Sequence, residues 1–417
     1  MNKMKDNWNP LNARRQIVYR ALKGLVDTKF YTTILISIML LGTAHLSSVM
    51  SSLAGSATIR SSGTIALFGL QLHIEGKYIK NDLGQVVHLR GINKHGFEDH
   101  PSGHWQRPNG NVDWNTFNPT VVAANLDAMK SWGINFIRSY STAQFWIENT
   151  GNHRQIIKDL ATMCAEREIY FMYSMWHILP GTGQTRMPFP PHITAREEAV
   201  IPSEDAFVDM WRSIANELKG YPNIIFEFWN EPGGTGSLSE WQRVWQKCID
   251  AVRGTGATNL ISLHYAYSIW INLDYGNGVT LSYVEDYPLN DTLGNIFYSP
   301  HNYRSDIHRT EPTRINCWTY EDLKLGLEMC LVNYTLNTLE IPVMLGEFGP
   351  NMWETGTELE HELEYYENLL TICNEWNMSY SPFLWWCTGF PYIQLNCQRN
   401  YPPNAAGQIL ISALSSD

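Results

Sequence analysis

From about residue 70 onward, hydrophobic residues follow two periodicities that alternate along the chain. Short hydrophobic runs typical of buried strands are separated by longer segments in which hydrophobic residues recur every three or four positions, as in amphipathic helices. The predicted strands are 86–93, 134–140, 170–176, 224–230, 260–266, 296–302, 342–348 and 382–387. The best-marked predicted helices are 118–131, 153–168, 204–219, 238–253, 320–339 and 357–376.

This alternation predicts an α/β fold with a parallel sheet and right-handed crossovers. Eight repeats favour closure into a single (β/α)8 TIM barrel over an open sheet. Ahead of the barrel, Leu72 to Ile79 and Val86 to Leu89 are predicted as two short strands around a turn at 81–84. Four long segments follow strands, at the end where barrels build their sites; they are 94–117, 178–203, 267–295 and 303–319.

The N-terminal part has a different pattern. Residues 1–29 hold seven Lys or Arg and two Asp, and no charged residue occurs from Phe30 to Ile59. We predict a basic segment at 1–29, a transmembrane anchor or cleaved signal at 30–50, a linker at 51–69 and the barrel at 70–417. Either function of 30–50 would place the barrel outside the cytoplasm, secreted or anchored; the membrane is a partner only if the segment is not cleaved.

Composition narrows the possible partners. The net charge is −11, and the chain beyond residue 29 holds 23 basic and 39 acidic side chains, which argues against binding nucleic acid. Charged residues are only 17%, whereas the 16 tryptophans provide many rings on which flat sugar faces can stack. The seven cysteines are scattered without a C-x-x-C pair, and no glycine-rich phosphate loop opens a predicted helix. We therefore expect that the protein binds no metal and no cofactor. We also expect it to be a monomer.

Two predicted strands end on a glutamate. Glu231 follows the run at 224–230 and precedes Pro232, and Glu347 ends the run at 342–348. Carboxylates at the carboxyl ends of barrel strands occupy the usual place of catalytic groups. A pair of glutamates on two such strands is the requirement for hydrolysis of a sugar bond.

Other polar or aromatic residues are predicted at the same end of the strands. Each of them alone has an ordinary structural explanation, but chance would scatter them over both ends. These residues are Arg138, His177, Asn230, His301, Tyr303 and one of Trp385 and Trp386. Glu227, inside the strand that leads to Glu231, is interpreted as a buried acid in a polar network.

The chain resembles glycoside hydrolase family 5, and in particular its bacterial and archaeal endo-β-1,4-glucanases. The sequence Trp229-Asn230-Glu231-Pro232 is similar to the family's Asn-Glu-Pro signature, and Gly346-Glu347-Phe348-Gly349 to its nucleophile segment. Further similar segments are 89–98, 135–138, 176–177 and 299–303. Two departures are Lys94-His95 after strand one and Ser174 on strand three, where an aromatic and an acidic residue are common.

The resemblance implies a retaining, double-displacement mechanism, with Glu347 as nucleophile and Glu231 as acid/base, and carboxyl groups about 5–5.5 Å apart. Arg138 would favour the ionised form of Glu347. The remaining residues would bind substrate or orient these groups: Arg138, His177, Asn230, His301, Tyr303, and Trp385 or Trp386, of which Trp385 fits the family's register better.

The expected activity is that of an endo-β-1,4-glucanase, or cellulase, acting on a β-glycan polysaccharide outside the cell. A β-mannanase or another β-glycan hydrolase of the family would carry the same glutamates, and a transglycosylase would share the covalent intermediate. A non-catalytic, membrane-tethered sugar-binding barrel is an alternative of another class. The two glutamates argue against that alternative, because a binding protein needs neither.

Overall fold

The computed structural model describes residues 69–95, 117–180, 186–266, 269–271, 278–304, 318–386, 394–396 and 400–416. The predicted basic segment at 1–29, the hydrophobic segment at 30–50 and all but the last residue of the linker lie outside the described residues. Within the described part of the chain, no helix is both long enough and apolar enough to cross a membrane.

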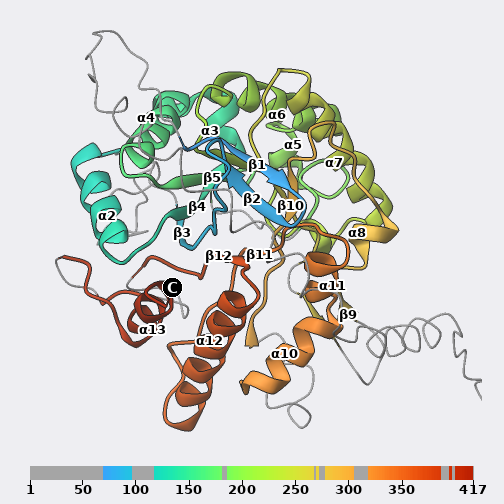
Figure 1. Cartoon of the computed structure of the whole chain (residues 1–417). Coiled ribbons are helices and arrows are strands. Elements are labelled where there is room, and N and C mark those ends of the chain that lie inside the picture. The colour runs from blue at the N-terminus through green and yellow to red at the C-terminus, as the bar shows by residue number, and fades with distance from the viewer. Residues whose placement is uncertain are drawn as a thin grey trace, which may run out of the picture. The chain divides into compact units, whose positions relative to one another are not determined.

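Eight parallel strands follow one another around the centre of the fold. Six form one sheet in the order β10 (Ile296–Tyr298), β7 (Ile261–Leu263), β6 (Ile224–Glu227), β5 (Tyr170–His177), β4 (Phe136–Thr142) and β3 (Gly91–His95). β11 (Met344–Leu345) pairs in parallel with β12 (Ser379–Tyr380). Parallel bridges from Tyr298 to Val343 and from Arg90 to Tyr380 connect this pair to the two edges of the sheet. The ring of strands is consistent with the predicted (β/α)8 barrel, with helices around it (Figure 1).

Helices separate the strands much as the hydrophobic periodicity predicts. They are α2 (Pro119–Ser131), α3 (Ala143–Glu148), α4 (His153–Ala165), α5 (Ala195–Glu198), α6 (Glu204–Leu218), α7 (Leu238–Arg253), α8 (Tyr283–Asp286), α10 (Tyr320–Met329), α11 (Val332–Asn337), α12 (Thr357–Glu375) and α13 (Ala405–Leu414), with short 3-10 turns at Thr150–Asn152 and Pro232–Gly234. Side chains of Asn118, Ser203 and Ser237 accept hydrogen bonds from the first turns of α2, α6 and α7, which fixes where these helices begin.

Three predicted elements need correction. The helix predicted at 320–339 is two helices, because Leu331 adopts a left-handed backbone with φ of 66° between α10 and α11. The strand predicted at 72–79 is a hairpin of β1 (Leu72–Glu75) and β2 (Tyr78–Asn81), since Gly76 takes the positive φ that its turn requires. The last strand, predicted at 382–387, is β12 at Ser379–Tyr380.

The hairpin covers the amino ends of the barrel strands. Leu72 and Ile79 of the hairpin, with Leu70 just before it, form one buried cluster with the first inward-facing side chains of the strands, among them Phe136 and Phe297. This apolar layer fills the amino end of the barrel. The polar side chains at the carboxyl ends therefore lie at the opposite end, above a packed core.

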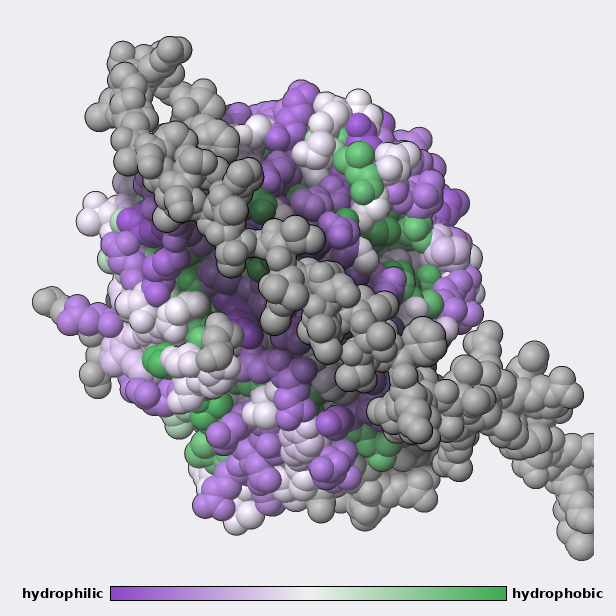
Figure 2. All heavy atoms as spheres, in the orientation of Figure 1, coloured by the Kyte–Doolittle hydropathy of each residue, from purple (hydrophilic) through white to green (hydrophobic). Residues whose placement is uncertain are grey.

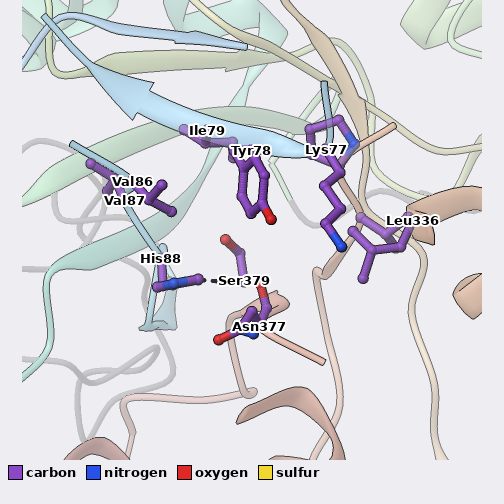
Figure 3. A pocket seen from close by; sticks show the side chains of 11 residues that line it. Lys77, Tyr78, Ile79, Val86, Val87, His88, Leu336, Asn377 and Ser379 are labelled. Carbon is purple, nitrogen blue, oxygen red and sulfur yellow. Dashed lines mark hydrogen bonds between the residues drawn. The ribbon is translucent and has the colours of Figure 1, made fainter. Parts of the chain in front are cut away.

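A small pocket lies beside this hairpin (Figure 3). It is lined by Lys77 and Tyr78 and by residues at the amino ends of strands, including His88 and Ser379; the ring of Tyr78 points toward Ser379. In the orientation of Figure 1, the coloured surface is mainly hydrophilic, with separate hydrophobic areas (Figure 2). The pocket lies at the amino ends of the strands, whereas the predicted site lies at their carboxyl ends. That the protein is a monomer stays a prediction.

Candidate active site

Glu231 stands just beyond the end of β6 in a left-handed backbone conformation, with φ of 51° and ψ of 56°. This conformation costs about 1–3 kcal/mol for a residue with a side chain. Its backbone N–H donates to Nε2 of His264, a residue one position beyond β7. Gly233 follows close to the backbone of Tyr265, where a Cβ would lie 2.6 Å from the carbonyl oxygen. The turn is thus held by contacts with the neighbouring strand.

Glu347 lies two residues beyond β11. Gly346 allows the chain to approach β10's extension closely, since a Cβ there would lie 2.9 Å from the carbonyl oxygen of Ser299. His301 and Glu347 form a parallel bridge, and the backbone N–H of Asn302 donates to the Glu347 carbonyl oxygen. The side chain of Glu347 therefore has a fixed position at the carboxyl end of the barrel.

The two glutamates face each other across His301. One carboxylate oxygen of Glu231, one of Glu347 and a ring nitrogen of His301 all lie within 4.8 Å of one another. Both glutamates are only 5% exposed. Nδ1 of His301 lies 2.6 Å from Oε1 of Glu231 and 3.7 Å from Oε2 of Glu347. The nearest oxygens of the two carboxylates are therefore close together; the separation of about 5–5.5 Å that the resemblance implies for the carboxyl groups stays a prediction.

Arg138, in β4, connects the two glutamate strands from below. Its Nη1 donates to Oε1 of Glu347 at 2.5 Å, and its Nη2 donates to Oδ1 of Asn230 at 2.8 Å. Its Nε donates to Glu227 at 2.7 Å. Burial alone would lower the pKa of Arg138, but the charges of Glu227 and Glu347 outweigh it, so that pKa lies well above its usual value. Arg138 is therefore a permanent positive charge beside Glu347.

Glu227 is a buried carboxylate in a polar network, as the sequence predicts. Its oxygens accept hydrogen bonds from the hydroxyls of Ser174, Ser262 and Ser299, and Oε2 pairs with Arg138 at 2.5 Å. Ser174, the residue that departs from the common acidic residue on strand three, thus binds this carboxylate. Burial acts to raise the pKa of Glu227, but the charge of Arg138 overcomes it and lowers that pKa.

We expect Glu227→Gln to lower the free energy of unfolding by about 3–5 kcal/mol at pH 7, because Arg138 loses one of its two buried carboxylates. A lowered native pKa stabilises the fold only above the unfolded value of about 4.3, and this stabilisation is lost as the pH falls toward the native value. The difference between the variant and the wild type should therefore shrink below about pH 4. Thermal unfolding at pH 7 and pH 3.5 measures it.

Glu217→Gln is the matched control, since Glu217 pairs with Arg154 and Lys158 at a partly exposed site. It should cost less than about 1 kcal/mol. A Glu227→Gln loss that is the same at both pH values would contradict the ionised state assigned to Glu227.

Sequence reasoning missed three residues of this site. Tyr140, two residues after Arg138 in β4, places its hydroxyl 2.5 Å from Oε1 of Glu347 and 2.6 Å from Oδ1 of Asn93. Asn93, in β3, is the second of these residues, and His264, which accepts the N–H of Glu231, is the third. Tyr140 could have been found, because residues two apart in a strand share a face. Tyr303, which was predicted, donates to Oε2 of Glu347 at 3.0 Å.

The structure separates the two candidate tryptophans. Trp385 packs outside the strands, where its Nε1 donates to Asn125 of α2 at 2.9 Å and its ring lies 4.7 Å from that of Trp132. Trp386 instead belongs to the buried cluster of Tyr140 and Tyr303. This placement favours Trp386 over Trp385 as the ring that faces the site, whereas the expected register favoured Trp385; a role in sugar binding stays a prediction for both.

His177 ends β5 and lies beside a second histidine. Its ring centroid is 6.3 Å from that of His95 and 5.0 Å from that of Trp176. His95 lies 5.9 Å from Tyr140 by the same measure. His177 is thus at the predicted end of the barrel. The ring of His95 lies near both His177 and Tyr140, the residue that contacts Glu347.

Among the described residues, Glu231, His301 and Glu347 form the one group with the spacing of metal ligands. Hydrogen bonds already engage these atoms, including the contact of His301 with Glu231 and those of Arg138 and Tyr140 with Glu347. The positive charge of Arg138 also disfavours a cation there. The prediction that the site needs no metal stays a prediction.

Two close carboxylates at the carboxyl ends of parallel strands, with helices between the strands, are the arrangement of barrel glycosidases. The cellulase model of glycosyl hydrolase family 5 matches residues 82–389, and the chain belongs to this family. The resemblance stated from the sequence is thereby confirmed.

Two curated relatives are similar to this chain at low identity. It is 24% identical over 269 residues to an endoglucanase of Clostridium saccharobutylicum, a match that covers 63% of this chain and 49% of the relative. It is 26% identical over 299 residues to endoglucanase A of Clostridium longisporum, covering 64% and 51%. The chain thus spans about half the length of the curated relatives it matches.

Two solved structures share the fold. A hyperthermophilic endocellulase of the archaeon Pyrococcus horikoshii matches with a TM-score of 0.60 at 18% identity, covering 84% of this chain and 99% of that one. A β-glucanase of Saccharophagus degradans, in complex with cellotetraose, matches with a TM-score of 0.62 at 14% identity, covering 86% and 97%.

Proposed function

We propose that this chain is a retaining glycoside hydrolase that cleaves internal β-1,4-glucosidic bonds of cellulose-like polysaccharides by double displacement. The observation that supports this most is the pair Glu231 and Glu347, whose carboxylate oxygens lie within 4.8 Å across His301. A sugar-binding protein without catalysis needs neither glutamate, nor a buried arginine beside one of them.

In the first step a carboxylate oxygen of Glu347 forms a bond to the anomeric carbon while the glycosidic C–O bond breaks. Glu231 gives its proton to the leaving oxygen. In the second step Glu231 takes a proton from water, the water oxygen bonds to the anomeric carbon from the other face, and Glu347 leaves as a carboxylate. Two inversions give net retention.

The surroundings of the two glutamates suit these roles. Arg138 places a permanent positive charge 2.5 Å from Glu347, opposite the negative charge that this side chain needs as a nucleophile. Burial, with the charges of His264 and Arg138, holds the pKa of His301 well below its usual value. His301 is therefore neutral beside Glu231, so their contact is a hydrogen bond between side chains and not an ion pair.

Asn230 suits the binding of a sugar hydroxyl. Its Oδ1 is held by Arg138, and its Nδ2 has no hydrogen-bond partner within the described part of the chain. A buried amide without a partner is costly, so a substrate acceptor such as the 2-hydroxyl would satisfy it. Tyr303 would orient Glu347, His301 and His177 would position hydroxyls, and Trp386 would stack on a sugar ring.

The choice of a β-1,4-glucan rests on the relatives. Two are named endoglucanases, and two structures that share the fold are described with cello-oligosaccharides, cellopentaose in one and cellotetraose in the other. A β-mannanase would use the same two glutamates, so substrate choice needs an experiment.

We also propose that the domain acts outside the cytoplasm, secreted or anchored by residues 30–50. A polymer such as cellulose is too large to enter a cell, and the uncharged stretch after a basic segment fits either form of export. Protease added to intact cells should digest an anchored domain; protection from the protease would contradict both forms.

The experiment compares the purified full chain on carboxymethylcellulose, β-mannan and xylan. We expect a rapid fall in the viscosity of carboxymethylcellulose with few reducing ends released, and loss of this effect in Glu347→Ala. Activity on mannan alone would keep the mechanism and change the substrate. No activity on any glycan would contradict the proposal and favour the sugar-binding alternative.

The two tryptophans give a further prediction. Trp386→Ala should raise KM for cello-oligosaccharides about tenfold, the loss of one stacking contact of roughly 1–1.5 kcal/mol. Trp385→Ala should leave KM near its original value and destabilise the fold by about 3–5 kcal/mol, because it empties a site in the core. Steady-state kinetics and thermal unfolding of both variants check this. The opposite assignment of the two effects would show that Trp385 is the sugar platform.

A further inference from the structure

The two oxygens of Glu347 have different surroundings. Oε1 accepts a hydrogen bond from Nη1 of Arg138 at 2.5 Å and lies 2.5 Å from the hydroxyl of Tyr140. Oε2 accepts from Tyr303 at 3.0 Å and lies 3.7 Å from Nδ1 of His301. Oε1 therefore points toward the buried arginine, and Oε2 points toward the side of His301.

The same His301 nitrogen is 2.6 Å from Oε1 of Glu231. Oε2 of Glu347 thus lies on the side of the site where the acid/base glutamate stands. A glycosidic bond held between the two glutamates would meet Oε2 first, while Oε1 remains bound to donors in the barrel.

Tyr140 can act only as a donor to Glu347. A phenol has one proton, and it lies near two acceptors, the Glu347 carboxylate and Oδ1 of Asn93. The ionised carboxylate is the stronger acceptor. Burial raises the pKa of Tyr140 well above its usual value, and although the charge of Arg138 opposes this, the Glu347 carboxylate adds to it. The hydroxyl stays protonated throughout the working range of an enzyme.

The ring of Tyr140 is fixed independently of this hydroxyl. Its centroid lies 4.4 Å from that of Trp176, 6.2 Å from that of Phe383 and 5.9 Å from that of His95. Replacing the hydroxyl by hydrogen should therefore leave the ring in place and remove one hydrogen bond from Glu347.

We propose that Tyr140 is a further catalytic residue of this enzyme: its hydroxyl donates to Oε1 of Glu347, so that Oε2 attacks the anomeric carbon and Oε1 becomes the carbonyl oxygen of the glycosyl-enzyme ester. This inference rests on the proposed function. A donor to Oε1 stabilises the carboxylate more than the ester. It restrains the first step, in which the carboxylate is consumed, and speeds the second, in which the carboxylate re-forms and the C–O bond to the sugar breaks.

The test is Tyr140→Phe, assayed as the full chain on 2,4-dinitrophenyl β-cellobioside. This leaving group departs easily, so the second step limits the rate. We expect kcat to fall about 10- to 100-fold, with KM falling alongside it, so that kcat/KM changes less than about threefold. Mass spectrometry during turnover should show most of the variant carrying one covalent sugar.

Tyr173→Phe is the control, since Tyr173 is a buried tyrosine of β5 whose hydroxyl contacts Ser141 and His153. It should leave both kinetic constants near those of the wild type. A Tyr140→Phe enzyme with unchanged kcat, or with a loss confined to kcat/KM, would overturn the proposal, because general damage to the site lowers kcat/KM.

A second measurement needs no substrate. If Tyr140 donates to Glu347, then Tyr140→Phe and Glu347→Gln should be non-additive in the free energy of unfolding. Additive effects would overturn the Tyr140 contact even if the wild type hydrolysed no glycoside. Non-additive effects with an inactive wild type would instead reject the proposed function, and with it the catalytic role assigned to Tyr140.

Discussion

Glu347→Ala should lower kcat on cello-oligosaccharides about 10⁴-fold or more, which corresponds to a loss of about 5 kcal/mol or more of transition-state stabilisation. The methyl group cannot form the glycosyl-enzyme, and Arg138 is left without the carboxylate 2.5 Å away. Because the substitution opens space on that face of the sugar, added azide should enter it and bond to the anomeric carbon in a single displacement. The product should be the α-glycosyl azide, with inverted configuration.

The configuration of the azide product decides the role of Glu347. NMR of the isolated product distinguishes the α from the β form. Glu362→Gln is a suitable control, since Glu362 is another buried carboxylate that pairs with an arginine, Arg304, at 2.6 Å. It should retain the double-displacement reaction. A Glu347→Ala enzyme with substantial activity and no need for azide would contradict the nucleophile assignment.

Glu231→Ala should affect substrates according to their leaving group. On cello-oligosaccharides, whose leaving alcohol needs a proton, we expect kcat to fall about 10²- to 10⁴-fold. On 2,4-dinitrophenyl β-cellobioside the first step needs no acid, so the glycosyl-enzyme should form and accumulate. Azide should then release it as the β-glycosyl azide, with retained configuration, because azide needs no general base.

Pre-steady-state release of dinitrophenol measures this effect directly. A burst equal to the enzyme concentration, followed by slow turnover that azide accelerates, is the expected result. His264→Asn is an informative companion, because it removes the acceptor of the Glu231 backbone N–H and keeps the Glu231 carboxyl group. This variant should lower kcat on cello-oligosaccharides and on 2,4-dinitrophenyl β-cellobioside to a similar degree. An equal loss on both substrates in Glu231→Ala would contradict its role as acid/base.

Strand ends were the part of the site that the sequence could reveal. Glu231 and Glu347 follow short hydrophobic runs directly, so the end of the barrel on which they lie follows from the strand direction. Asn230, His301 and Tyr303 were found in the same way. The helix pattern was equally direct at α7, whose bounds at 238–253 agree with the prediction residue for residue.

Side-chain contacts between different strands could not be predicted from the sequence. Tyr140 and His264 look like ordinary strand residues until the ring of strands brings Tyr140 to Glu347 and His264 to the backbone of Glu231. The positions of Trp385 and Trp386 relative to the site were difficult to predict for a related reason. Both lie several residues beyond the end of β12 at Tyr380, where the alternation of a strand no longer fixes which side chain points inward.

Interruptions within predicted helices and strands were also not predicted from the sequence. Residues 320–339 keep a helical pattern of hydrophobic positions, and no proline or glycine marks the left-handed residue Leu331 between α10 and α11. The error at the first hairpin was of another kind. Gly76 indicates a turn in the sequence, but residues 72–79 were predicted as one strand.

The covalent intermediate tests the central claim most directly. The full chain is incubated with 2,4-dinitrophenyl 2-deoxy-2-fluoro-β-cellobioside, whose fluorine slows both steps while the good leaving group keeps the first step measurable. We expect stoichiometric inactivation and a single labelled peptide, with the sugar on Glu347. A label on any other residue, or turnover of β-glucan by an enzyme that this reagent does not label, would contradict double displacement through Glu347.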